Sequence, residues 1–302
     1  MTYSIVARDP ATGELGVAVQ TRWPFVGETV PWAEPGVGAV ATQSFSDKRY
    51  GALGIERMRA GVAAPDVLAA LLADDEEREV RQVGMVDASG RSASFTGSRC
   101  VVEAGQVTFQ DVAIQANMME RPTVWPAMAE AFRSAPGDLA DRLIAALRAA
   151  EAEGGDVRGR QSAALLVVPG EGPAWATRFD LRIDDHRAPQ DELERLLRLA
   201  RAYEAFDRSE APMLAGDFAA GVAAMDEAHR LAPDDDQITL WTALAAGAAG
   251  DLERARRLLA EAQAAEPRSL EHLRRFVAAG HLPSAAAALI NELDENVERY
   301  GS

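Results

Sequence analysis

Residues 2–20 read TYSIVARDPATGELGVAVQ, and this stretch decides how the fold begins. Ser4–Arg8 and Leu15–Gln20 are short runs rich in strand-forming residues. The segment between them, DPATG (residues 9–13), has turn chemistry, because proline fixes φ and the glycine can adopt positive φ. The pattern predicts a β-hairpin whose first strand begins close to Thr2.

Thr2 is the first candidate for chemistry, because it directly follows Met1. Initiator methionine is usually trimmed when the next side chain is small. Trimming would leave a hydroxyl and a free α-amine on one residue, which is a nucleophile with its own general base. The unperturbed pKa of an α-amine is ~7.7–8.0, so a useful fraction is neutral at physiological pH. The alternative is that Thr2 is an ordinary second residue.

Composition indicates a soluble globular protein with room for one large or two medium domains. The 302 residues are 48% hydrophobic and 26% charged, with a formal net charge of −16. This charge disfavours nucleic acid and anionic membranes as partners. The sequence shows neither a long apolar span nor a secretory signal, and its single cysteine, Cys100, fits a reducing compartment. We therefore expect a cytoplasmic protein, and its abundant arginine and alanine suggest a bacterial source.

Histidines are almost absent from the N-terminal part of the chain. The four are His186, His229, His272 and His281, so the first 185 residues have none. This distribution disfavours Ser-His-Asp, Cys-His and histidine-rich metal sites, and CxxC and HExxH patterns do not occur. We expect no metal and no cofactor. An N-terminal nucleophile is one of the few hydrolytic designs that needs no histidine.

The first 186 residues alternate groups of strands with pairs of helices. That order favours an α+β fold with layered sheets and helices outside, rather than strict βαβ alternation. The further strands expected are Val37–Gln43, Val80–Asp87, Ser92–Thr96, Cys100–Val102, Val112–Gln115, Ser162–Val168 and Arg178–Ile183. The helices expected are two within Tyr50–Ala73, split near Gly61–Pro65, then Thr123–Arg133 and Asp138–Glu153.

Residues 190–302 contain an internal repeat and no strand pattern. Gly216-Asp217-Phe218 recurs 34 residues later as Gly250-Asp251-Leu252, which is the tetratricopeptide period. The same offset pairs Met225 with Leu259, Ala228 with Ala262 and Pro233 with Pro267. The repeat predicts a small all-α tetratricopeptide-like domain with atypical ends, in which Pro212 interrupts a first helix. The alternative is an unrelated antiparallel bundle. Such a domain would offer a surface for a protein partner or for self-association, and we expect a homo-oligomer.

Several segments resemble a bacterial family of uncharacterised Ntn-hydrolase-like proteins (domain of unknown function 1028). The matching segments are TYSIVARD (2–9), GELGVAV (13–19), GVGAVATQ (36–43), RQVG (81–84), QANM (115–118), RGRQSAAL (158–165) and DDH (184–186). The resemblance covers residues 2–186 in order, which sets the domains at 1–189 and 190–302. It implies the four-layer αββα sandwich of Ntn hydrolases, in which the nucleophile begins a strand at the edge of the cleft between the sheets.

The opening hairpin also resembles proteasome β-type subunits, with two departures. Those subunits carry an aspartate on the second strand, and the corresponding position here, counted from the glycine turn, is approximately that of Gln20. They also carry a lysine on a later strand, whereas the only lysine of this chain is Lys48. Arg22, just after the second strand, resembles the arrangement in Ntn hydrolases of the bile-salt-hydrolase and penicillin-acylase type. That resemblance implies a fixed cation that lowers the pKa of the α-amine and favours hydrolysis of a small amide.

The remaining candidates are polar residues at strand ends, each with a structural alternative. Asn117 is a candidate oxyanion donor, or an asparagine in a turn. Thr42 and Gln43 end a strand and are expected to face the cleft; the alternative is that they are polar only because the strand lies at a sheet edge. The polar run Asp156, Arg158, Arg160, Gln161 and Ser162 is expected to contact substrate, with the arginines binding a carboxylate, or to form a solvated loop.

Three functions follow from these residues. The first is an N-terminal-nucleophile amidohydrolase in which Thr2 attacks, its α-amine accepts the proton, Arg22 tunes the amine and Asn117 holds the oxyanion. The second is a catalytically inactive Ntn-like module that binds a small molecule, with a helical tail that binds a partner. The third is a threonine peptidase. Cys100 is expected to be a buried structural thiol rather than the nucleophile.

Overall fold

The computed structural model describes residues 2–282, 290 and 291. The chain divides into two compact units, Met1–Leu196 and Leu197–Ser302. The expected boundary at residue 189 falls at the start of helix α6 (Pro189–Ala215), and the division between the units lies within this helix. Met1 and the end of the tail lie outside the described residues.

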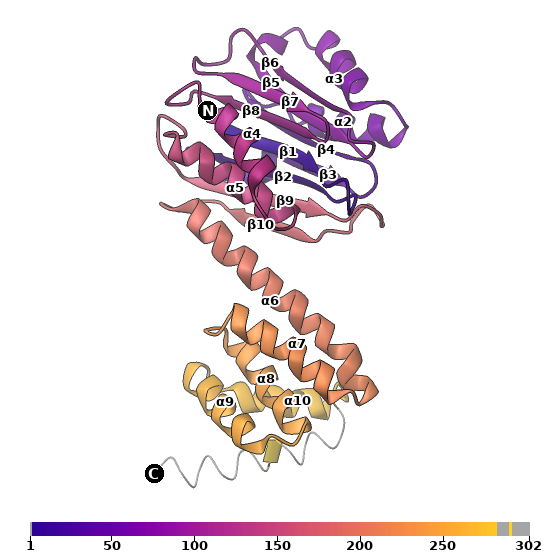
Figure 1. The fold of residues 1–302 in the computed structure, drawn as a ribbon, viewed down its shortest axis with the longest axis vertical. Coiled ribbons are helices and arrows are strands. Elements are labelled where there is room, and N and C mark those ends of the chain that lie inside the picture. Colours follow the sequence, from indigo (N-terminus) through magenta and orange to yellow (C-terminus); the bar gives the residue numbers. More distant parts are fainter. Residues whose placement is uncertain (1, 283–289, 292–302) are drawn as a thin grey trace. The chain divides into compact units, whose positions relative to one another are not determined.

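A six-stranded antiparallel sheet forms the centre of the first unit (Figure 1). Its order is β10-β9-β2-β1-β8-β7, so the first two strands of the chain lie in the middle. The strands are β1 (Thr2–Arg8), β2 (Leu15–Thr21), β7 (Gly105–Phe109), β8 (Val112–Asn117), β9 (Ser162–Val168) and β10 (Phe179–Ile183). The β1–β2 hairpin turns at Gly13, which has φ +76°, and this confirms the turn expected there.

A four-stranded antiparallel sheet packs against the first one. Its order is β3-β4-β5-β6, with strands β3 (Pro31–Glu34), β4 (Gly38–Ser44), β5 (Arg81–Asp87) and β6 (Ser92–Thr96). The core between the sheets is built from small and β-branched side chains, among them Val6, Val17, Val19, Ala39, Ala41 and Val86. Small side chains let the sheets approach closely, and the short helix α1 (Val26–Thr29) adds Val26 to this core.

Helices cover the outer face of each sheet. Helices α4 (Val124–Ser134) and α5 (Leu139–Ala152) pack on the six-stranded sheet, and α2 (Arg49–Arg59) and α3 (Ala64–Ala73) pack on the four-stranded sheet. The 3₁₀ turn η1 (Arg78–Val80) leads into β5. Asp138 and Asp141 form a reciprocal capping box that starts α5. The layers therefore run helices, sheet, sheet, helices, and the mixed α+β class expected from the sequence is confirmed (Figure 1).

One expected strand is wrong. Residues 100–102 form no ladder; the backbone N–H of Met118, the residue after β8, donates to the Val101 carbonyl at 3.2 Å. The strand in this region is β7, which pairs with β8 and alternates between half-buried and exposed positions. The sequence did not predict β7, β3 or α1, which are short or lie at a sheet edge.

The described part of the second unit is helical. After α6 come α7 (Phe218–Leu231), α8 (Asp236–Ala248), α9 (Leu252–Ala265) and α10 (Ser269–Ala278). Helices α7 and α9 coincide at the 34-residue offset, and each begins after a left-handed glycine and an N-cap aspartate, Gly216-Asp217 and Gly250-Asp251. The paired positions Met225 and Leu259 are both buried. The expected break at Pro212 is wrong, because α6 continues to Ala215 and the Pro212 carbonyl accepts a bond from the N–H of Asp217. None of the described helices combines the length and apolar character needed to cross a membrane.

Candidate functional site

Thr2 begins the central strand β1 and lies in a row of polar residues at one end of the six-stranded sheet. It pairs with Asn117 of β8 on one side and with Thr21 of β2 on the other, and Thr21 pairs with Ser162 of β9. We call this row of strand ends, Asn117, Thr2, Thr21 and Ser162, the Thr2 edge. Side chains alternate along a strand, so Thr2 shares a face with Val6, which packs between the sheets. The Thr2 hydroxyl donates to the Thr21 hydroxyl at 3.1 Å, and only 7% of Thr2 is exposed.

The carbonyl of Thr2 is held by a buried amide from the other sheet. Nε2 of Gln43 lies 3.1 Å from the Thr2 carbonyl oxygen, 2.8 Å from Oε1 of Gln82 and 3.2 Å from the Gln115 carbonyl. Oε1 of Gln43 accepts a bond from the Ser4 hydroxyl at 2.7 Å. Gln43 is 1% exposed, so these bonds form away from water, where a lost partner is costly. This one side chain therefore links both sheets to the backbone of Thr2.

Asn117 and Gln82 extend this buried network. Nδ2 of Asn117 donates to Oε1 of Gln82 at 2.6 Å and lies 3.4 Å from the Thr2 carbonyl oxygen. Nε2 of Gln82 in turn donates to the Ala116 carbonyl at 2.8 Å. Nε2 of Gln115 donates to the Ser4 hydroxyl at 2.6 Å. We name Gln43, Gln82, Gln115, Asn117 and Ser4 the amide network; all five are buried.

A second polar cluster lies on the opposite face of β1, under helix α5. Glu151 accepts bonds from the Tyr3 hydroxyl at 2.6 Å and from Nε2 of Gln20 at 2.6 Å, and it pairs with Nε of Arg160 at 2.8 Å. Burial, then the charge of Glu151, holds the pKa of Tyr3 well above its usual range. Gln20, which stands about where proteasome-type subunits have an aspartate, thus supports a structural carboxylate.

The polar run before β9 is held by its own partners. Arg158 binds Asp156 through Nε at 3.1 Å and Nη2 at 2.8 Å, and Asp156 also accepts from the backbone N–H of Arg22 at 3.1 Å. The Arg22 guanidinium bonds to Oε1 of Gln161, and Nε2 of Gln161 donates to Asp185 at 3.1 Å. Among the described residues, the side chain of Arg22 has no other hydrogen bond or ion pair, so it lies beside the Thr2 edge without bonding Thr2. The arginines expected to bind a substrate carboxylate, Arg158 and Arg160, both hold carboxylates of this chain.

Three further candidates have local structural partners. The Ser162 hydroxyl donates to the Trp23 carbonyl and accepts from the N–H of Val26 at 3.3 Å. Thr42 precedes Gln43 and therefore faces the opposite side of β4, where its hydroxyl donates to the Asp47 carbonyl at 3.2 Å. The expectation that Thr42 and Gln43 face the cleft together is wrong for this reason. Lys48 is exposed and pairs with Glu28 at 2.8 Å.

Backbone strain is concentrated around the Thr2 edge. Five described non-glycine residues have left-handed φ, and four of them lie here: Phe25, Ser44, Glu103 and Met118. Ser44 is the last residue of β4, and Met118 directly follows the end of β8. Met119 donates to the Glu103 carbonyl at 3.1 Å, and Phe25 donates to the Asp184 carbonyl, just past β10, at 3.2 Å. Left-handed φ is unfavourable for such residues, and strained residues of this kind often cluster at functional sites.

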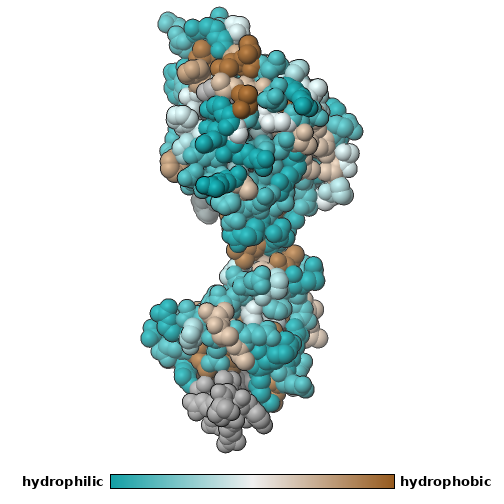
Figure 2. Space-filling model, turned by 90° about the vertical axis from the view of Figure 1, so that its left-hand side faces the viewer, coloured by the Kyte–Doolittle hydropathy of each residue, from teal (hydrophilic) through white to brown (hydrophobic). Residues whose placement is uncertain are grey.

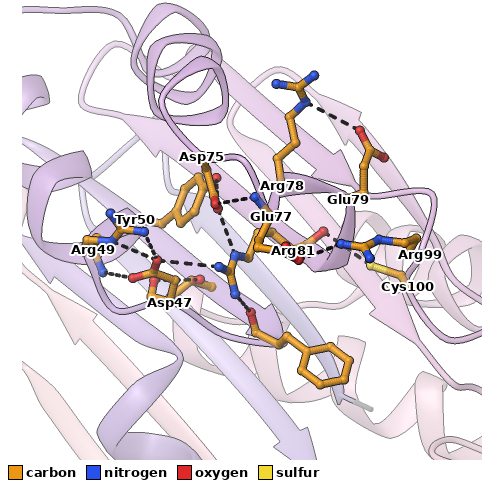
Figure 3. A network of polar contacts seen from close by, with 12 residues as sticks. Asp47, Arg49, Tyr50, Asp75, Glu77, Arg78, Glu79, Arg81, Arg99 and Cys100 are labelled. Carbon is orange, nitrogen blue, oxygen red and sulfur yellow. Dashed lines mark hydrogen bonds and ion pairs between the residues drawn. The ribbon is translucent and has the colours of Figure 1, made fainter.

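A charged network supports the strand ends of the four-stranded sheet (Figure 3). Asp75 accepts from Nε of Arg81 at 2.9 Å, from the Tyr50 hydroxyl at 3.0 Å and from the Glu77 N–H at 2.9 Å. The Arg81 bond holds the pKa of Asp75 below its usual range. Nη1 of Arg81 also donates to the Phe45 carbonyl at 2.7 Å. The network therefore fixes the chain just after Ser44.

Cys100 lies beside this network as a half-buried thiol. Its Sγ donates to the Arg81 carbonyl at 3.3 Å, and burial raises the pKa of the thiol. A raised pKa leaves little thiolate at neutral pH, so Cys100 is a poor nucleophile. Within residues 2–282, 290 and 291, His, Cys, Asp and Glu form no group suited to a metal ion.

Sequence reasoning missed Thr21 and most of the amide network. Ser4, Gln82 and Gln115 lie within strands whose other residues are mostly apolar. A serine or glutamine at such a position is an available signal, since buried polar groups need partners. Their mutual contacts depend on the pairing of two sheets from distant parts of the chain, which no local pattern shows.

The first unit is thus a sandwich of two antiparallel sheets with helices outside and a buried polar row at one end of the strands. The chain belongs to the family of unknown function DUF1028, whose model matches residues 2–193. Among solved structures it is similar to the crystal structure of protein SPO2555 from Silicibacter pomeroyi, a member of the same family. The two share 34% sequence identity with a TM-score of 0.60, over 65% of this chain and 87% of the other. No curated protein matches the chain.

Proposed function

We propose that the first unit is an Ntn-type amidohydrolase with Thr2 as nucleophile, built on a four-layer αββα Ntn-hydrolase-like sandwich. The observation that carries the proposal is the place of Thr2 at the head of the central strand, with its side chain between two sheets and its carbonyl bonded by Gln43. The strained residues at the same edge support it.

The chemistry follows from the atoms of Thr2. Oγ1 attacks the carbonyl carbon of an amide, and its proton passes to the α-amine that removal of Met1 would expose. The tetrahedral intermediate collapses as the amine donates the proton to the leaving nitrogen, so the C–N bond breaks and an ester on Thr2 remains. Water then hydrolyses the ester with the amine again as base. In this proposal the positive charge of Arg22 favours the neutral amine, and Asn117 donates to the oxyanion after leaving one of its present acceptors.

Labelling with a β-lactone tests the nucleophile, because Thr2 Oγ1 would open the ring and keep the acyl group. Intact-mass measurement should show loss of Met1 and one added acyl group in the wild type. Thr2→Ala should abolish labelling and Thr2→Ser should retain it, and both keep a small second residue. Thr12→Ala, in the exposed hairpin turn, is the matched control and should label normally. Labelling that depends on Thr2 while Met1 is retained in every preparation would contradict the proposed mechanism.

A catalytically inactive ligand-binding module is the second candidate. The position of Arg22 favours it, because the guanidinium bonds to Gln161 and forms no described bond with Thr2. If the module is inactive, Thr2→Ala and the wild type should bind a small-molecule ligand equally well, and neither should turn it over. A threonine peptidase is the third candidate, and degradation of an unstructured peptide would distinguish it.

The second unit supports a proposal of its own. We propose that residues 190–302 form a tetratricopeptide-like domain that binds a protein partner or a second copy of the chain, since two helices repeat at the 34-residue offset with the same caps. Sedimentation velocity of the full chain across a hundredfold range of concentration would distinguish self-association from a monomer that binds a different protein.

A further inference from the structure

Large apolar side chains gather at the Thr2 edge although they gain little burial there. Trp23, Phe25, Phe45, Val102 and Val157 are between 55% and 79% exposed. They are five of the seven large hydrophobic residues exposed in the described part of the first unit; the others are Val62 and Trp175. Figure 2 views the side on which β1 begins, and a small group of hydrophobic residues lies near the top of this mostly hydrophilic face of the first unit. We name the five residues the apolar rim. Exposed apolar surface of this kind marks interaction sites.

Every member of the apolar rim lies on a segment tied to the Thr2 edge. The Trp23 carbonyl accepts from the Ser162 hydroxyl, and the N–H of Val157 donates to the Met118 carbonyl at 3.2 Å. Val102 follows Val101, whose carbonyl accepts from the N–H of Met118. Phe45 follows Ser44 at the end of β4, two residues after Gln43, which bonds Thr2. The rim thus comes from separate loops that converge on one end of the sheets.

The backbone beneath the two phenylalanines is fixed. Arg81 donates to the Phe45 carbonyl, and the N–H of Phe45 donates to the Val80 carbonyl at 3.3 Å. Ser44, the residue before it, has φ 70°, and Phe25 itself has φ 61°. The chain accepts unfavourable backbone geometry at positions that present aromatic rings to solvent. A fixed backbone leaves less conformational entropy to lose when these residues bind a ligand.

Three carboxylates near the rim are paired with arginines of the chain, whereas the Arg22 guanidinium bonds to the uncharged amide of Gln161. Asp156 pairs with Arg158, Glu151 with Arg160 and Asp75 with Arg81. A cationic substrate group would have to replace one of these arginines, whereas an apolar group needs only to displace water from the rim. Apart from Arg22, the contacts that the edge offers a ligand are therefore mainly the exposed apolar side chains of the rim.

We propose that the apolar rim binds an alkyl or aromatic acyl group of the substrate, next to the amide that Thr2 attacks. This rests on the proposed function, in which the acyl group stays attached to Thr2 through both half-reactions and is therefore the half that the edge must hold. The substrate class is an amide of an apolar carboxylic acid. Trp23 and Phe45 are its specificity residues, because an aromatic ring contributes the largest apolar area.

Two matched β-lactones test the proposal by their rates of labelling, read by intact mass. One carries an unbranched octyl chain and the other a chain of equal length that ends in a carboxylate. The octyl lactone should label the wild type at least tenfold faster. Trp23→Ser and Phe45→Ser should each lower the rate of labelling by the octyl lactone about tenfold, the size expected for a lost aromatic contact. The rate of labelling by the carboxylate lactone should stay within about twofold of that of the wild type. Trp175→Ser is the matched control, since Trp175 is 83% exposed in the β9–β10 turn at the other end of the sheet. Equal rates for the two lactones would overturn the proposal.

A binding measurement separates this proposal from the proposed function. N-phenyl-1-naphthylamine, a neutral apolar fluorophore, should bind the wild type and Thr2→Ala alike and bind Trp23→Ser and Phe45→Ser at least fivefold more weakly. If Thr2 is not labelled but the fluorophore binds in this pattern, Thr2 is not the nucleophile, and the proposal of an apolar binding site stands. Absence of fluorophore binding in the wild type would overturn the apolar site. A wild-type dimer that dissociates in Phe45→Ser would also overturn it, by showing that a second copy covers the rim.

Discussion

Nε2 of Gln43 lies 3.1 Å from the carbonyl oxygen of Thr2 and joins the second sheet to the first residue of β1. The same nitrogen contacts two further oxygens, so it serves as the donor at the centre of the amide network. An amide nitrogen has two hydrogens for three acceptors, so the bonds are shared. The geometry requires an amide here, and a carboxylate of the same shape would not replace it.

Gln43→Glu should therefore destabilise the first unit. It would put an oxygen where the nitrogen now faces the oxygens of Thr2, Gln82 and Gln115, and it would bury a charge without a partner. We expect a loss of roughly 3 kcal/mol in the free energy of unfolding at pH 7, measured by urea denaturation. Gln106→Glu is the control, because Gln106 is exposed on β7 and bonds only at the surface; it should change stability by less than about 0.5 kcal/mol. A stability of Gln43→Glu equal to that of the wild type would show that the network does not hold β1.

Gly84→Ala should disturb the same network from the facing strand. A Cβ at position 84 would lie 2.2 Å from Oε1 of Gln115, which is fully buried and bonded to Ser4. The expected cost is about 2 kcal/mol, because the glutamine cannot swing away without losing its partner. Gln115→Ala in the Gly84→Ala background removes the clash, so the double mutant should be more stable than the sum of the single effects predicts. Strict additivity would argue against contact between the two positions.

Asp75 and Arg81 give the first unit a sensitivity to acid. The pKa of Asp75 is lowered in the folded protein, chiefly by its bond to Arg81, so the pair stabilises the fold above the unfolded pKa of about 3.9. This contribution disappears as the pH falls through the lower folded pKa. Asp75→Asn should cost about 2 kcal/mol at pH 7, and the difference from the wild type should shrink below pH 4. Urea unfolding at pH 7, 4 and 3 measures this; an unchanged difference at all three pH values would assign the loss to packing alone.

Asp217 and Asp251 cap equivalent helices of the repeat and should have equal effects. Each side chain accepts a bond from the N–H three residues on, at 3.1 Å for Ala220 and 3.2 Å for Arg254. Replacing either aspartate by alanine should lower the free energy of unfolding of the second unit by about 1 kcal/mol, measured by urea denaturation. Asp234→Ala is the control, because Asp234 is exposed and lies outside a helix. If the two alanine variants lose clearly different amounts of unfolding free energy while the control is unchanged, the repeats are not energetically equivalent.

The sequence predicted the parts of the fold that depend on local patterns. The hairpin at Gly13, the helix pair within residues 49–73 and the strand at Ser92–Thr96 follow from turn chemistry and periodicity, and each is present. The edge strand β7 was missed because its exposed, half-polar pattern resembles that of a loop. Thr42 was assigned to the wrong side because two adjacent residues of a strand were both placed on one face, which the alternation of side chains forbids. The partners of Gln43 come from β1, β5 and β8, and only the packing of two sheets brings these strands together.

The place of Thr2 at the head of a central strand also determines how the protein must be handled. An affinity tag fused ahead of residue 2 would emerge among the ends of β2 and β8 and would turn the α-amine into an ordinary peptide nitrogen. Under the mechanism proposed above, such a fusion would fold, purify and show a normal melting curve while carrying no usable base. Activity screens on this protein therefore need a tag at the C-terminal end, or a protease site that leaves threonine as the first residue.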